Sequence, residues 1–151
     1  MIVALRYQEE FLSQCEQEVA PLAELEWEES GHPTCSLVID WETYFVYEDM
    51  GRLKFFTARD EDNRLVGYFL VLITSPLTCK GELVASYDAV YIHKDYRKST
   101  AARRMFKFVE DCLREDHIYR VVASSSVKNP IGNFLNRLGY NEIETKYEKV
   151  L

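Results

Sequence analysis

Residues 83–126 read LVASYDAVYIHKDYRKSTAARRMFKFVEDCLREDHIYRVVASSS. Two apolar runs, residues 83–93 and 119–126, flank residues 100–115, in which apolar side chains recur at helical spacing. The first run is apolar on both faces, which is typical of a central strand covered by helices. A strand, a helix and a strand of these lengths predict a βαβ unit with parallel strands and a right-handed crossover.

The sequence before this unit predicts three helices. Residues 7–19 carry an apolar stripe at helical spacing, and a second helical piece, residues 21–29, starts at a proline. A third helix is expected over residues 40–49, because Asp40 is a good N-cap and Gly51 is placed to end it.

Strand patterns occupy much of the remaining chain. Residues 53–60 and 64–74 predict a β-hairpin around a polar turn. Residues 130–139 predict a short helix between a proline and a glycine, and alternation over residues 141–150 predicts a last strand. The order predicts a mixed α/β fold, an α+β mixed sheet with N-terminal helices, antiparallel strands, a central βαβ unit, and a C-terminal helix and strand.

The composition is that of one globular domain, residues 1–151, with 47% hydrophobic and 28% charged residues and no linker-like run. No apolar stretch approaches membrane-spanning length and none resembles a signal peptide, so we expect a cytoplasmic location and no membrane contact. The four cysteines are far apart and form no C-x-x-C pair, which predicts neither a zinc site nor a redox site.

Charge is distributed unevenly along the chain. The net charge of −7 argues against nonspecific nucleic-acid binding, which needs a basic surface. Residues 1–30 hold eight glutamates and one arginine, whereas residues 94–107 hold six basic residues and one acid. The basic segment therefore stands out from an otherwise acidic protein.

The basic segment includes the loop RKST, residues 97–100, between a predicted strand and a predicted helix. The start of a helix offers unpaired N–H groups and the positive end of its dipole, which together favour an anion. Arg103 and Arg104 in the first turn oppose the dipole unless an anion is bound there. Alternatively, these basic side chains face solvent or pair with the acidic helices.

Three segments carry patterns that occur together in one known family. Residues 91–111, YIHKDYRKSTAARRMFKFVED, are similar to a strand ending in V-x-P-x-Y-R followed by R/Q-x-x-G-x-G/A and a helix. Residues 57–71, TARDEDNRLVGYFLV, resemble a hairpin with an L-V-G-Y arm, and residues 129–140, NPIGNFLNRLGY, resemble an N-x-x-A...L-x-x-x-G-F/Y segment. In this order the three resemble the GNAT superfamily of acetyl-CoA-dependent N-acyltransferases.

This resemblance implies a GNAT-like fold with splayed parallel strands, acetyl-CoA as acyl donor and no metal. The cofactor-binding residues that it implies are Ile92, His93, Arg97, Lys98, Ser99, Thr100, Ala101, Ala102, Asn129 and Phe134. Thr100 replaces the first glycine of the signature, and Ala102 is an allowed substitute for the second. Many members use a tyrosine to protonate the departing thiolate, but the matching positions here read Phe134, Leu135 and Asn136.

The implied chemistry is direct attack of a neutral amine on the acetyl thioester. Backbone N–H groups near Ile92 and His93 are expected to polarise the thioester carbonyl, although His93 is alternatively a solvent-facing loop residue. Asp88 lies in an otherwise apolar strand, so it is either the general base or a structural partner of a buried Arg or Tyr. Further acids that could reach the acceptor, or simply face solvent, are Glu28, Glu29 and Glu82.

In this family the N-terminal helices wall the acceptor pocket, so their glutamates are compatible with a cationic acceptor such as a polyamine or a protein amine. An acidic, solvated helix face is the alternative. The rival function is a catalytically degenerate GNAT-like module that binds CoA or a protein partner without turnover. No nucleic-acid partner is expected, and a homodimer is compatible with the sequence.

Overall fold

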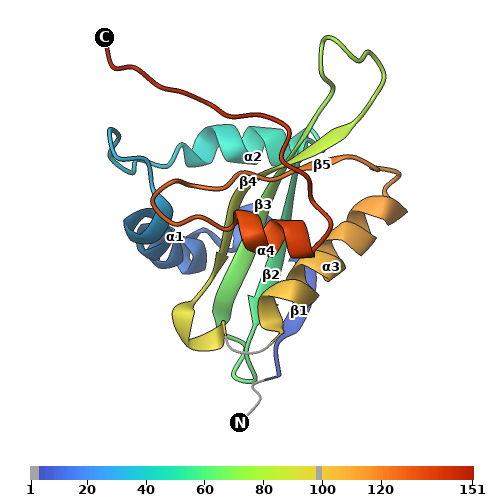
Figure 1. Cartoon of the computed structure of the whole chain (residues 1–151). Coiled ribbons are helices and arrows are strands. Elements are labelled where there is room, and N and C mark those ends of the chain that lie inside the picture. The colour runs from blue at the N-terminus through green and yellow to red at the C-terminus, as the bar shows by residue number, and fades with distance from the viewer. Residues whose placement is uncertain (1–3, 98–99) are drawn as a thin grey trace.

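A five-stranded sheet in the order β1-β2-β3-β4-β5 forms the centre of the molecule (Figure 1). The computed structural model describes residues 4–97 and 100–151. Neighbouring strands are antiparallel except β4 and β5, which are parallel. The strands are β1 (Arg6–Glu10), β2 (Leu53–Arg59), β3 (Leu65–Thr74), β4 (Val84–Ile92) and β5 (Val121–Val122).

Helices cover both faces of this sheet (Figure 1): α1 and α2 pack on one face, and α3 and α4 on the other. Helix α3 connects the parallel strands β4 and β5, which confirms the predicted βαβ unit. The helices are η1 (Leu12–Gln14), α1 (Glu16–Ser30), α2 (Trp41–Asp49), η2 (Lys94–Tyr96), α3 (Ala101–Glu115) and α4 (Gly132–Arg137). In the described part of the chain, no helix combines the length and apolarity that a bilayer span requires.

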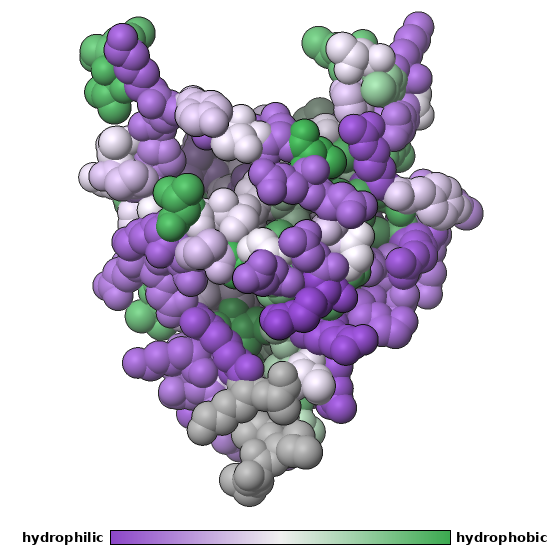
Figure 2. Space-filling model, in the orientation of Figure 1, coloured by the Kyte–Doolittle hydropathy of each residue, from purple (hydrophilic) through white to green (hydrophobic). Residues whose placement is uncertain are grey.

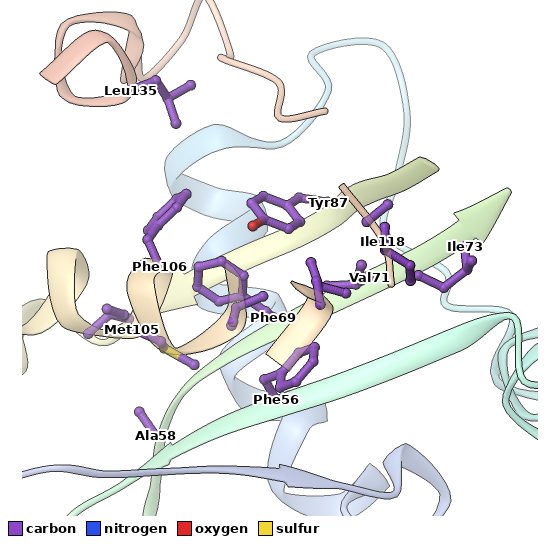
Figure 3. Packing of buried hydrophobic residues seen from close by; sticks show 14 of the residues in the cluster. Phe56, Ala58, Phe69, Val71, Ile73, Tyr87, Met105, Phe106, Ile118 and Leu135 are labelled. Atoms are coloured by element: carbon purple, nitrogen blue, oxygen red, sulfur yellow. The ribbon is translucent and has the colours of Figure 1, made fainter. Parts of the chain in front are cut away.

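The central strand β3 buries side chains on both of its faces. Tyr68 and Leu70 pack in the core beneath α1 and α2, whereas Phe69 and Val71 pack in the core beneath α3 (Figure 3). Phe69 meets Phe106 of α3 edge to face, with 4.8 Å between ring centroids. This two-sided burial explains why the strand is almost entirely apolar.

The predicted helix over residues 7–19 is wrong at its start. Residues 6–10 form the edge strand β1, in which Tyr7 lies opposite Ala58 of β2. Five residues are too few for periodicity to distinguish a strand from a helix, so pairing with β2 determines that this segment is a strand. The true helical stripe begins later, and its buried members are Leu12, Cys15, Val19 and Leu22. Pro21 lies exposed inside α1 and does not start a new helix.

The predictions for α2 and the hairpin are confirmed. The Asp40 carboxylate accepts a hydrogen bond from the Thr43 amide at 3.1 Å, which caps α2. Strands β2 and β3 pair antiparallel, and Asn63 in their turn has φ 62°, a left-handed conformation that asparagine tolerates.

The C-terminal region is less regular than predicted. Only Val121 and Val122 of the expected strand 119–126 form a ladder, and the helix expected over residues 130–139 is the shorter α4. Residues 141–150 form no strand with any described residue, although their sequence alternates. Alternation describes which faces a strand would bury, but a strand forms only where a partner edge is within reach.

Arg59, which is 5% exposed, joins β2 to β1 and α1. Its guanidinium donates to both carboxylate oxygens of Glu10 at 2.9 and 3.0 Å, and to Glu18 at 2.7 and 3.0 Å. Burial alone would raise the pKa of Glu10, but hydrogen bonds from Arg59 and Thr57 outweigh it and hold the pKa at about 2. The acidic N-terminal segment thus neutralises a buried cation.

We expect Arg59→Met to lower the free energy of unfolding by about 3 kcal/mol, because it leaves the half-buried Glu10 carboxylate without its cation. The Glu10 pKa is depressed in the folded state, so its contribution is present above pH about 4.5 and is lost as the pH falls toward 2. Urea unfolding at pH 7 and pH 3 measures both effects. Arg114→Met, at an exposed ion pair, is the control and should cost less than about 1 kcal/mol. Equal costs for the two variants would contradict the assignment.

Candidate active site

Asp88 occupies a β-bulge in β4. Leu70 of β3 pairs with Ala89 and Val71 pairs with Tyr87, so Asp88 is left without a partner in the ladder. A bulge redirects the side chain of its extra residue, and the Asp88 side chain is exposed. Asp88 was expected among the apolar side chains of this strand, as the general base or as the partner of a buried Arg or Tyr, but it lies exposed at the bulge.

The Asp88 carboxylate accepts a hydrogen bond from the hydroxyl of Tyr44, on α2. Burial, followed by the contact with Asp88, raises the pKa of Tyr44, so this hydroxyl stays protonated as a donor. Tyr44 also lines a shallow cavity of about 310 Å³ between α2 and the loop before it. The other residues that line it are Leu37, Val38, Ile39, Asp40, Thr43 and Tyr47. Asp88 is not among the lining residues, and the Tyr44 hydroxyl is its link to this cavity.

A second acid–tyrosine pair lies on the same side of the sheet. The half-buried Glu26 of α1 accepts a hydrogen bond from the hydroxyl of Tyr68, on β3. Burial raises the pKa of Glu26 to about 7; the Tyr68 hydrogen bond lowers it, and the nearby charges of Asp88 and Glu29 raise it further. A carboxyl group with this pKa can exchange a proton near neutral pH.

Glu26 was not among the candidate residues named from the sequence, although its position in the helical pattern could have marked it. Glu26 continues the buried stripe of α1, four residues after Leu22 and seven after Val19, where an apolar residue would be expected. A glutamate on the buried face of an amphipathic helix is unusual enough to mark a functional candidate.

Arg97 is held by protein groups. Its Nε donates to the Ile92 carbonyl at 2.7 Å, and its Nη2 pairs with Glu29 of α1 at 2.6 Å. Its guanidinium carbon lies 5.4 Å from the centre of the Tyr91 ring. Arg97 thus links the end of β4 to α1. This agrees with the alternative stated above, in which the basic side chains pair with the acidic helices.

The junction of β4 and α3 brings several of the expected cofactor residues together. Ile92 is buried at the end of β4, and the His93 amide donates to the Val66 carbonyl at 2.7 Å, so this N–H is already used. His93 also caps η2, since its Nδ1 accepts from the Asp95 amide at 3.2 Å. His93 is therefore a loop residue with structural bonds.

The start of α3 is exposed and basic. Thr100 precedes the helix but makes no capping hydrogen bond with its side chain, and the first turn contains no acid. Ala101 and Ala102 are partly exposed, and Arg103 and Arg104 are exposed. Lys98 and Ser99, expected to contact the cofactor, lie outside the described residues. N–H groups without a side-chain cap from Thr100, beside small side chains and two arginines, suit a phosphate.

The last two expected cofactor residues, Asn129 and Phe134, belong to the region after β5. Asn129 is exposed in the loop after β5. Phe134 of α4 packs edge to face on Phe106, with 5.4 Å between ring centroids, so it contributes to the core. Tyr140 is close in sequence to the missing family tyrosine, but its hydroxyl lies 3.2 Å from that of Tyr87 and donates to Glu110 at 2.8 Å.

The sequence matches the acetyltransferase (GNAT) family over residues 11–140. The chain belongs to this family. The family assignment made from residues 57–71, 91–111 and 129–140 is therefore confirmed.

The fold agrees with solved structures of GNAT acetyltransferases. A predicted acetyltransferase from Clostridium acetobutylicum, solved with acetyl-CoA, superposes with a TM-score of 0.73 at 13% identity over 97% of this chain and 96% of that one. A ribosomal-protein-alanine N-acetyltransferase from Brucella melitensis gives 0.74 at 18% identity, over 98% and 99%. Glucosamine-6-phosphate N-acetyltransferase from Arabidopsis thaliana gives 0.68 at 14% identity, over 97% and 98%. No curated protein matches the chain significantly in sequence.

The raised pKa of Glu26 predicts a pH-dependent stability. A carboxyl group whose pKa is raised on folding favours the folded state below pH about 4.5, and this contribution is lost as the pH rises through about 7. Glu26→Gln should therefore raise the melting temperature at pH 8 and leave it nearly unchanged at pH 4. Glu24→Gln, at an exposed position of α1, is the control. A Glu26→Gln melting temperature equal to that of the wild type at pH 8 would contradict the shift.

Proposed function

We propose that residues 1–151 form one N-acetyltransferase domain that transfers the acetyl group of acetyl-CoA to a primary amine by direct attack. The nitrogen forms a bond to the acetyl carbon, the carbon–sulfur bond breaks, and the products are an amide and CoA. The observation that carries this proposal is the family match, joined to an exposed carboxylate, Asp88, at the bulge of β4.

The start of α3 is the proposed site for the phosphates of acetyl-CoA. Its first-turn N–H groups have no capping side chain from Thr100, and exposed Arg103 and Arg104 supply positive charge. Thr100, Ala101 and Ala102 are small enough for close approach of a phosphate. Bound acetyl-CoA would supply the activated acetyl group, and Ile92 and His93 would line its path along the end of β4.

Asp88 is the proposed general base. Most amines are protonated near neutral pH, so a proton must leave before the nitrogen can attack. The Asp88 carboxylate is exposed and is held by Tyr44, so it can accept that proton from an amine that reaches the bulge. Glu26 would assist binding, because its carboxylate adds negative potential near Asp88 and favours a cationic acceptor.

Ion pairs within the protein neutralise some of the acidic side chains that could attract a cationic acceptor. The N-terminal segment holds eight glutamates, but Glu10 and Glu18 neutralise Arg59, and Glu29 neutralises Arg97. Among the acids that remain, we assign the attraction for an ammonium group to Asp88 and to Glu26, whose pKa the charge of Asp88 raises. Both a small-molecule amine and a protein amine fit this requirement.

The proposed base leads to a direct kinetic expectation. Asp88→Asn should lower kcat/KM about 100-fold, because the variant cannot accept the proton, whereas Tyr44→Phe should lower it less. The measurement is CoA release with acetyl-CoA and a panel of cationic, neutral and anionic amines. Asp49→Asn at the end of α2 is the control and should be fully active. Full activity of Asp88→Asn with loss in Glu26→Gln would transfer the role of base to Glu26.

Cofactor binding is tested separately from turnover by thermal shift. Acetyl-CoA and CoA should raise the melting temperature, whereas ATP should do so less. The double variant Arg103→Gln and Arg104→Gln should need about tenfold more ligand for the same rise in melting temperature. Arg114→Gln, at the far end of α3, should need no more ligand than the wild type. Stabilisation without CoA release from any amine would favour the degenerate module, and no stabilisation would contradict acetyl-CoA binding.

A further inference from the structure

The loop between α1 and α2 presents three consecutive apolar residues at the surface. Val38 is 88% exposed, and its neighbours Leu37 and Ile39 are half-buried. On the face that Figure 2 draws, hydrophobic residues lie in small, separate groups on a mainly hydrophilic surface. A run of three apolar residues on a loop is unusual for such a surface unless the run has a function.

These residues form one wall of the shallow cavity of about 310 Å³, and α2 forms the other. Its two short polar side chains are bonded to each other. One oxygen of the Asp40 carboxylate accepts from the Thr43 amide at 3.1 Å, and the other accepts from the Thr43 hydroxyl at 2.7 Å. The rest of the lining consists of Leu37, Val38, Ile39, Tyr44 and Tyr47. A guest therefore meets mainly apolar side chains, and an apolar group gains most from entering.

Tyr44 links this cavity to the proposed base. It lines the cavity, and its hydroxyl is engaged as a donor to Asp88. An acceptor whose amine reaches Asp88 thus has the cavity at the distance of one tyrosine side chain, which a short carbon chain can span. Binding energy from a part of the substrate remote from the reacting atoms helps to hold the nitrogen in position for attack.

Asp40 makes a second ammonium group the rival guest, because it is the charged residue of the lining. Hydrogen bonds from Thr43 lower the pKa of Asp40, so its carboxylate is ionised at neutral pH. However, Asp40 is exposed, so water and salt screen its charge. Both of its oxygens also accept from Thr43. The cavity therefore favours an apolar guest over a cationic one.

We propose that the acceptor carries an apolar group, joined to its primary amine by a short chain, and that this group occupies the cavity between α2 and the loop before it. This inference rests on the proposed function, in which the amine loses its proton at Asp88. It narrows the acceptor from cationic amines in general to amines with an apolar end. Val38 and Tyr47 then determine specificity, because they offer apolar surface to that end.

The first test compares amines of equal length as acceptors with acetyl-CoA. The probes are hexylamine, the amino alcohol of the same length and the diamine of the same length, and CoA release gives kcat/KM for each. Hexylamine should exceed the amino alcohol about tenfold, because a hydroxyl group that enters an apolar site loses its bonds to water. The diamine should be no better than the amino alcohol. A diamine better than hexylamine would identify Asp40 as a cation site and overturn the proposal.

The second test changes the loop. Val38→Asp should lower kcat/KM for hexylamine about tenfold, mainly through KM, because it places a charge beside the apolar guest. Ethylamine is too short to reach the cavity, so its kcat/KM should not change. The Val38 side chain is exposed, so the variant should fold, which circular dichroism checks. Leu77→Asp, at an exposed residue of the loop between β3 and β4, is the control and should keep the preference for hexylamine.

A polypeptide could present the same chemistry through its first residue. Peptides that begin with leucine or with serine form a second matched pair, and the pair with the higher kcat/KM shows whether the acceptor is a polypeptide or a small molecule. The proposal is overturned if neither pair favours its apolar member, or if Val38→Asp leaves that preference intact. CoA release from none of these amines would instead contradict the proposed function, and this inference with it.

Discussion

The burial of both faces of β3 is the constraint on which the rest of the structure depends. Phe69 and Val71 require cover from α3, and Tyr68 and Leu70 require cover from α1 and α2. A sheet covered in this way leaves few places for polar groups, and those that occur are paired. Tyr68 shows the consequence: its ring belongs to the core and its hydroxyl reaches Glu26 at the site.

The parts of the fold that follow from local pattern were predictable, and those that follow from pairing were not. The βαβ unit, the hairpin and the capped α2 each have long periodic segments or a specific cap such as Asp40. Strand β1 was mistaken for a helix because its five residues adjoin the true helical stripe. Residues 141–150 show the reverse case, because their alternation is clear but they form no strand with any described residue.

The candidate site divides in the same way. The motif around Arg97 identified the family, yet the structure gives Arg97 an ion pair with Glu29, while Arg103 and Arg104 lie exposed at the start of α3. Composition could not show this, because it counts charges without their partners. Glu26 was missed for the same reason: burial in the folded chain raises its pKa, and the charge of Asp88, on another strand, raises it further.

The two acid–tyrosine pairs divide the work in the proposed reaction. Asp88 is exposed at the bulge, so an incoming ammonium group can reach it. Glu26 is half-buried, and the charge of Asp88 raises its pKa. A cation bound near both carboxylates would favour the ionised form of Glu26, so binding itself would increase the negative potential around Asp88. When the proton and the acetylated product leave, Glu26 returns to its partly protonated state. The bulge in β4 and the glutamate on the buried stripe of α1 therefore act as one unit, which neither strand nor helix could form alone.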